Sequence, residues 1–75
     1  MRIEQVIARN LREIRLKRGL TQEAVAGRAY LQSNYYACVE RATKMLSIAA
    51  LTKIAKVLNV QPYILLKPEG STEVQ

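Results

Sequence analysis

Short polar side chains recur at helical spacing between residues 33 and 41. At about 100° per residue, one side of a helix there would carry Ser33, Asn34, Ala37, Cys38 and Arg41, with Tyr36 and Val39 on the opposite side. Hydroxyl and amide groups so close to the backbone can form hydrogen bonds with a flat partner. A merely solvated side would normally carry Glu and Lys, which favour helix formation. The residue types therefore favour a recognition surface, with a solvated side as the alternative.

The charge of the chain is strongly basic. Twelve Lys and Arg residues stand against six acidic ones, which gives a net charge of +6. Such an excess is typical of proteins that meet phosphate groups, although a solvated basic surface is the alternative interpretation. A chain of 75 residues has room for one domain with a small core and no separate catalytic cleft. We therefore expect its function to lie on a surface.

Several kinds of chemistry are excluded by the residues that the chain lacks. Without histidine, Ser-His and Cys-His catalytic pairs cannot form, and with a single cysteine a zinc site would lack enough ordinary ligands. Cys38 is the only cysteine, so an internal disulfide is excluded. We expect no enzymatic activity, no metal and no cofactor. No run of 18 apolar residues occurs and charged residues interrupt the N-terminal segment, so we expect neither a membrane span nor a signal peptide, and a cytoplasmic location.

Two helices are predicted before the polar segment. The first runs from Ile3 to Arg18 and is followed by Gly19, a residue that suits the end of a helix. Thr21 is a good N-cap for a second helix that runs to about Ala29. The buried stripe of the first helix comprises Ile3, Val6, Ile7, Leu11 and Ile14.

Further helices are predicted on both sides of a short loop. The polar segment forms a third helix, from Ser33 to Arg41, and Ser47 caps a fourth helix. Asn59 can adopt a left-handed conformation, and Pro62 fits the first turn of a fifth short helix. The chain from 68 to 75 is expected to be a disordered tail. The stripe of the fourth helix comprises Ile48, Leu51, Ile54, Ala55 and Leu58.

Four sequence pieces carry a resemblance to a known family: Leu11 to Arg15, Gly19 to Glu23, Val39 to Arg41, and Leu51 to Val60. Together they resemble the phage-repressor-like (Cro/C1, or xenobiotic-response-element type) helix-turn-helix family over about residues 5–66. The resemblance implies an all-α fold, a compact five-helix lambda-repressor-like domain at 1–67. Its second and third helices would form the helix-turn-helix, and its partner would be a double-stranded DNA operator.

The resemblance also implies roles for individual residues. Ser33, Asn34 and Cys38 occupy positions that reach base edges, and the Asn34 amide can pair with adenine N6 and N7 in the major groove. Gln22 would bind a phosphate oxygen and brace the third helix. Arg15 and Glu40 would form an ion pair between the first and third helices.

Other residues near the third helix are candidates for weaker contacts with DNA. Tyr35 could touch a phosphate or a thymine methyl group. Arg41, Thr43 and Lys44 lie where relatives follow the sugar-phosphate backbone, with a solvated loop as the alternative. Cys38 could instead be a packing residue or a redox sensor.

The chain also departs from the family pattern. Relatives usually have Gly where this chain has Tyr30, and often at Ala42, so the paths of both turns are open. Leu16 lies off the apolar stripe of its helix. Surplus apolar residues near the C-terminus predict a homodimer interface that would let the protein read a palindrome. The interface residues would be Tyr63, Ile64 and Leu66.

Within the family, the runs 14–23 and 40–48 are similar to the controller proteins of restriction-modification systems. Those proteins are dimers that bind operators upstream of their own gene and the endonuclease gene, activating at low concentration and repressing at high concentration. RNA polymerase is then a further candidate partner, through a surface such as Glu23. The alternatives are a phage-type repressor, an antitoxin acting as a protein-interaction module, and an architectural binder without operator preference.

Overall fold

The computed structural model describes residues 2–68, which form four α-helices and one 3-10 helix and no strand. The elements are α1 (Ile3–Lys17), α2 (Gln22–Arg28), α3 (Ser33–Glu40), α4 (Ile48–Leu58) and η1 (Pro62–Leu66). The all-α prediction is confirmed, but the count of five helices is slightly off, because the predicted fifth short helix is a 3-10 helix. In the segment that begins at Pro62, backbone amides donate to the carbonyl three residues earlier, as a 3-10 helix requires. The Ile64 amide, for example, donates to the Gln61 carbonyl (3.0 Å). The predicted tail lies outside the described residues, apart from Pro68.

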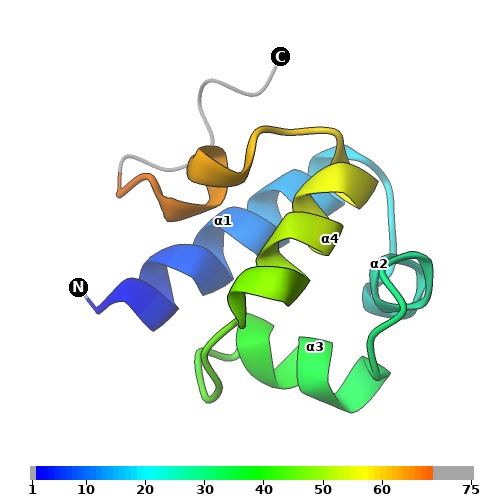
Figure 1. Ribbon diagram of the computed structural model, residues 1–75, viewed down its shortest axis with the longest axis horizontal. Helices are drawn as coiled ribbons and strands as arrows, with labels where there is room; N and C mark the ends of the chain where they lie inside the picture. Colours follow the sequence, from blue (N-terminus) through cyan, green and yellow to red (C-terminus); the bar gives the residue numbers. More distant parts are fainter. Residues whose placement is uncertain (1, 69–75) are drawn as a thin grey trace.

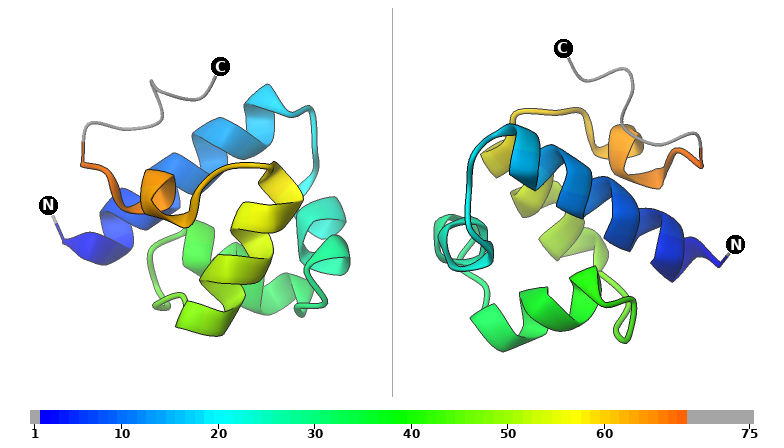
Figure 2. Two further views of the ribbon diagram at one scale, coloured as in Figure 1. Left: turned by 45° about the horizontal axis from the view of Figure 1, so that its top comes forward. Right: turned by 180° about the vertical axis from the view of Figure 1, so that it is seen from behind.

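The helices surround one small core. In Figure 1, α4 lies across α1, with α3 below them and α2 to one side. The view from behind in Figure 2 shows α1 along the back of the molecule, with η1 next to it. Residues from all five elements are fully buried, among them Leu11, Ile14, Val25, Tyr36, Ile54, Leu58 and Leu65.

The predicted starts of α2 and α4 are confirmed by their caps. The Thr21 hydroxyl accepts a hydrogen bond from the Ala24 amide (3.0 Å), and the Ser47 hydroxyl accepts one from the Ala50 amide (3.1 Å). Each bond satisfies an amide that has no partner within the helix. These caps fix where the two helices begin.

The turns after α2 and α3 both use a left-handed residue that is not glycine. Tyr30 has φ 58° and Ala42 has φ 62°. In each turn, the next amide bonds back to a carbonyl five residues earlier: Leu31 to Ala26 (2.8 Å) and Thr43 to Cys38 (3.0 Å). This is a Schellman ending, which normally selects glycine at the left-handed position. The backbone of Tyr30 and of Ala42 is therefore strained by about 1 kcal/mol relative to glycine.

Two residues of the predicted stripes are exposed, and Leu51 is half-buried. Ile3 is 45% exposed and Ile48 is 83% exposed. Each is the first residue of its helix, α1 or α4. The period of the stripe is therefore right, but the first turn of each helix extends beyond the core.

Candidate nucleic-acid interface

The outer side of α3 presents short polar groups because its inner side is fixed in the core. Tyr36 and Val39 are 0% and 1% exposed, whereas Ser33 and Asn34 are exposed and Cys38 is half-buried. The exposure therefore follows the arc predicted from the sequence. Side chains on such an arc can reach into a groove while the backbone of the helix stays supported.

A nearly buried carboxylate joins α3 to two other helices. Glu40 accepts hydrogen bonds from Arg15 through Nε (2.7 Å) and Nη2 (3.0 Å), and from Gln22 Nε2 (3.0 Å). The Arg15 and Glu40 side chains are only 10% and 3% exposed. The predicted ion pair and the bracing by Gln22 are thus present. Arg15 also donates to the Leu20 carbonyl (2.9 Å), which fixes the chain just before α2.

This network changes the acidity of its members. Burial favours the neutral form of Glu40, but the hydrogen bonds from its neighbours, chiefly Arg15, hold the pKa of Glu40 below its ordinary value. The bond to Glu40 likewise raises the pKa of Arg15, against the effect of burial. Burial, together with the Glu40 carboxylate, raises the pKa of Tyr36. Arg15 and Glu40 are therefore both charged at neutral pH.

Two predicted contact residues are engaged with the protein itself. The Tyr35 hydroxyl donates to the Met45 carbonyl (3.3 Å) and accepts from the Ser47 amide (3.1 Å). The Thr43 hydroxyl donates to the Cys38 carbonyl (3.1 Å) at the end of α3. These bonds hold the loop between α3 and α4, so the hydroxyl protons of Tyr35 and Thr43 have an internal role that the sequence analysis missed.

Two of the predicted phosphate-contacting residues, Arg41 and Lys44, lie beside the C-terminal end of α3. Arg41 and Lys44 are exposed beyond the end of α3. Arg41 Nη2 donates to Cys38 Sγ (3.2 Å), so the guanidinium lies over the outer side of the helix. A cation in that place can approach a phosphate without moving the backbone.

Asn10 is a structural residue that the sequence analysis missed. Its side chain is fully buried, and Nδ2 donates to the carbonyls of Ile64 (3.3 Å), Leu65 (3.0 Å) and Lys67 (2.9 Å). This amide attaches η1 to α1. The signal was an amide in a helix stripe that is otherwise apolar, three residues after Ile7, where a side chain must be buried with its partners.

Arg18 was missed as well. Its Nε donates to the Leu58 carbonyl at the end of α4 (2.8 Å). The bond satisfies one of the carbonyls left open where a helix ends, and it ties the end of α1 to the end of α4. Nothing in the local sequence indicates a contact between residues so far apart in the chain.

The apolar residues expected at a dimer interface divide into two groups. Tyr63 and Leu66 are 56% and 39% exposed. Ile64 is only 6% exposed and belongs to the core. The expectation that Ile64 is a surface residue is wrong, because the tight turn of η1 directs both Ile64 and Leu65 into the core.

Two further observations concern metal sites and membrane spans in the described part of the chain. Residues 2–68 contain no cluster of three potential metal-ligating side chains from His, Cys, Asp and Glu. No helix within the same range is both long and apolar enough to cross a membrane.

Comparison with known proteins places this geometry in a family. The helix-turn-helix family model matches residues 11–65, which is more than half of the chain. The control protein C.BamHI of Bacillus amyloliquefaciens is 37% identical over 65 residues, covering 85% of this chain and 80% of the relative. A hypothetical transcription factor of Neisseria meningitidis serogroup B is 33% identical over 66 residues, which is 88% of this chain. The match spans only 62% of the length of that Neisseria relative.

Solved structures agree with the sequence matches. The crystal structure of a hypothetical transcription factor from Neisseria superposes with a TM-score of 0.86 at 33% identity, covering 89% of this chain and 77% of that one. The restriction-modification controller protein C.AhdI from Aeromonas hydrophila gives 0.80 at 32% identity, covering 83% and 94%. The chain therefore belongs to the helix-turn-helix family of DNA-binding transcription regulators and is related to restriction-modification controller proteins.

Proposed function

We propose that this protein is a sequence-specific regulator that binds a palindromic operator as a homodimer and controls its own gene and a restriction endonuclease gene. The observation that carries the proposal is the outer side of α3, where Ser33 and Asn34 are exposed on a helix held by the Arg15–Glu40 pair. The similarity to control protein C.BamHI and to C.AhdI supports the controller role.

In this proposal, α3 enters the major groove. Asn34 hydrogen-bonds a base edge, and adenine is the best match for its amide. Ser33 and Cys38, which have shorter side chains, contact the neighbouring base edges. Tyr35 contributes its ring rather than its hydroxyl, because the hydroxyl is bonded to Met45 and Ser47. Specificity therefore depends mainly on the N-terminal half of α3.

Phosphate contacts orient the domain on DNA. Arg41 and Lys44 follow one strand beyond the end of α3. Gln22 contacts a phosphate of the DNA backbone at the other end of the interface. One hydrogen of its Nε2 amide is bonded to Glu40, so the second hydrogen is the one that donates to the phosphate. Thr43 approaches the same strand as Lys44 but mainly shapes the loop, since its proton is bonded to Cys38.

The dimer would be formed through η1. Tyr63 and Leu66 expose apolar surface on an element that Asn10 holds firmly to α1. A two-fold pair of domains would place the two α3 helices about 34 Å apart, which matches one turn of DNA. Because one eight-residue helix offers little base contact, a second copy supplies the remaining affinity and specificity.

The role as a controller sets the order of events on DNA. Low concentrations of protein fill one operator and activate transcription through contact with RNA polymerase. Higher concentrations fill a second operator and repress. Such an order would delay restriction until the host DNA is methylated.

A gel-shift titration against the region upstream of the protein's own gene tests this proposal. Excess random DNA is added as competitor, and the titration is repeated at two salt concentrations, because nonspecific binding depends steeply on salt. We expect a shift that survives the competitor and a second shift at higher protein concentration. Complexes that disappear with competitor would instead favour an antitoxin or an architectural binder, and a single resistant shift would favour a simple repressor of the phage type.

A further inference from the structure

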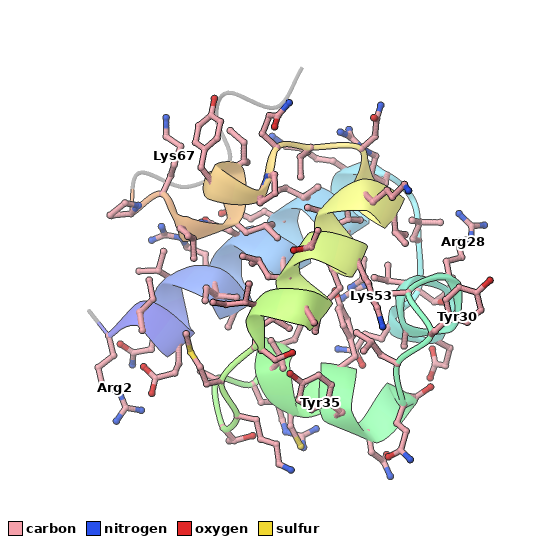
Figure 3. The ribbon with its side chains drawn as sticks, in the orientation of Figure 1. Arg2, Arg28, Tyr30, Tyr35, Lys53 and Lys67 are labelled. Atoms are coloured by element: carbon pink, nitrogen blue, oxygen red, sulfur yellow. The ribbon has the colours of Figure 1, made fainter. Side chains whose placement is uncertain are left out.

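A cleft of about 450 Å³ lies between the end of α2 and α4. It is lined by Arg28, Ala29, Tyr30, Lys53, Lys56 and Val57, none of which we assign to DNA contact or to the dimer. Figure 3 shows Lys53 between α4 and α2, with Tyr30 and Arg28 extending from the end of α2. The volume falls within the range of about 300 to 1,000 Å³ that is common for small-molecule sites.

The cleft is strongly basic. Arg28, Lys53 and Lys56 are all exposed, and within residues 2–68 none of them has a hydrogen bond or ion pair from its side chain. Lys53 and Lys56 are three residues apart on α4, so they lie side by side on the helix surface and repel one another. An anion bound between the three cations would relieve that repulsion.

The floor of the cleft is apolar. Ala29 is buried and Val57 is half-buried, and the carbon stems of the lysines extend this surface. A simple inorganic anion would leave the floor uncovered. The lining therefore suits a molecule with an anionic group at one end and an apolar or aromatic body at the other.

Tyr30 provides an independent indication of function. Its backbone is left-handed (φ 58°), where glycine is the least strained residue, yet its side chain is 89% exposed. The fold therefore gains little from burying this ring, and it accepts strain to keep the ring beside the cleft. Strain of this kind is typical of binding sites.

We propose that the cleft binds a small amphipathic anion, a carboxylate or a phosphate monoester attached to an apolar or aromatic group. Tyr30 lies in the turn that joins α2 to α3, three residues before Ser33. A molecule that bridges this turn and α4 would fix the position of the start of α3. The anion would thus act as an effector of DNA binding, a consequence that rests on the proposed function, whereas the binding itself does not.

Binding is tested without DNA, by NMR titration of the full chain with 3-phenylpropionate, phenyl phosphate and the uncharged 3-phenylpropanol. We expect saturable shifts of the Tyr30 and Val57 amides with at least one anion below about 10 mM, and none with the alcohol. The two anions distinguish a carboxylate site from a phosphate site. No saturation with either anion, or equal binding of the alcohol, would overturn the proposal.

Variants separate the cleft from general charge effects. The double variant Lys53→Gln/Lys56→Gln should weaken binding of the anion about tenfold or more, while Lys17→Gln, which removes a lysine at the end of α1, should not. Tyr30→Gly should also lose affinity, with a Tm no lower than that of the wild type because the strain is removed. Unchanged affinity in both cleft variants would contradict the site.

The effector role is measured on operator DNA. A saturating concentration of the bound anion should change operator affinity by at least about fivefold in the wild type but not in Lys53→Gln/Lys56→Gln. Binding of the anion with no change in operator affinity would refute the effector role. Without anion, a larger loss of affinity for random DNA in Lys53→Gln than in Lys17→Gln would show that the cleft serves DNA instead. If the wild type finds no operator at all, the proposed function fails while the NMR result stands.

Discussion

Arg15 of α1 and Glu40 of α3 are joined by two hydrogen bonds of 2.7 and 3.0 Å at a place that is almost closed to water. Gln22 of α2 donates to the same carboxylate. Helices α1, α2 and α3 therefore share one charged centre. Because a charge in such a place needs its partner, the pair fixes the orientation of α3 strongly.

The first prediction concerns the loss of one partner of this pair. We expect Glu40→Gln to lower the free energy of unfolding by about 3 kcal/mol, since the Arg15 charge stays nearly buried without its carboxylate. Urea unfolding followed by circular dichroism measures the change. As a control, the apolar pair Arg15→Met/Glu40→Leu should be less destabilised than Glu40→Gln. Equal loss in both variants would mean that packing, rather than charge, holds α3.

The second prediction concerns pH. The pKa of Glu40 is lower in the folded protein than its ordinary value of 4.5, so folding favours the charged form. The stabilisation is present above the ordinary pKa and is lost as the pH falls through the lower folded value. The urea midpoint of the wild type should therefore fall more steeply below pH 4.5 than that of Glu40→Gln. Parallel curves for the two proteins would show that Glu40 does not contribute to the acid sensitivity.

The third prediction concerns the attachment of η1. Asn10→Ala should destabilise the protein by about 2 kcal/mol, because it removes the Nδ2 donor of the Leu65 carbonyl and leaves the Ile64 carbonyl with only the long bond from the Lys67 amide (3.4 Å). Arg12→Ala, at an exposed position of the same helix, should change stability by no more than about 0.5 kcal/mol. Thermal unfolding compares the two. A small effect of Asn10→Ala would mean that apolar packing alone holds η1.

The sequence was sufficient to predict much of the fold. Residues with local effects, such as the caps Thr21 and Ser47, act on their own helix and could be identified without a structure. The Arg15–Glu40 pair could be predicted only through the family resemblance, because its members are 25 residues apart.

What the sequence did not reveal depends on contacts between distant segments. Asn10 bonds carbonyls more than fifty residues away, and the Tyr35 hydroxyl bonds a loop whose path the sequence left open. The burial of Ile64 could not be predicted, because the position of a residue in the turn of η1 cannot be determined from a five-residue segment. Side-chain direction in such turns follows from tertiary packing.

The fourth prediction concerns the dimer. Leu66→Lys should shift the protein towards monomer in sedimentation experiments at micromolar concentration, because a charge in an apolar interface is unfavourable. Leu66 is 39% exposed, so the monomer should stay folded. Leu16→Lys, at another exposed leucine, should leave the association unchanged. Wild-type protein that is monomeric both alone and with operator DNA would refute the dimer.

The central claim is that the outer side of α3 reads DNA sequence. The most direct test is to measure the affinity for operator DNA and for random DNA at one salt concentration. The ratio of the two affinities is then compared between the wild type, Asn34→Ala and Lys44→Ala. Asn34→Ala should lose about 1 to 3 kcal/mol on the operator and much less on random DNA, so its ratio falls. Lys44→Ala should weaken both complexes alike and keep the ratio, because a phosphate contact carries no sequence information. Equal losses on both DNAs from Asn34→Ala would contradict the assignment of α3 as the reading element.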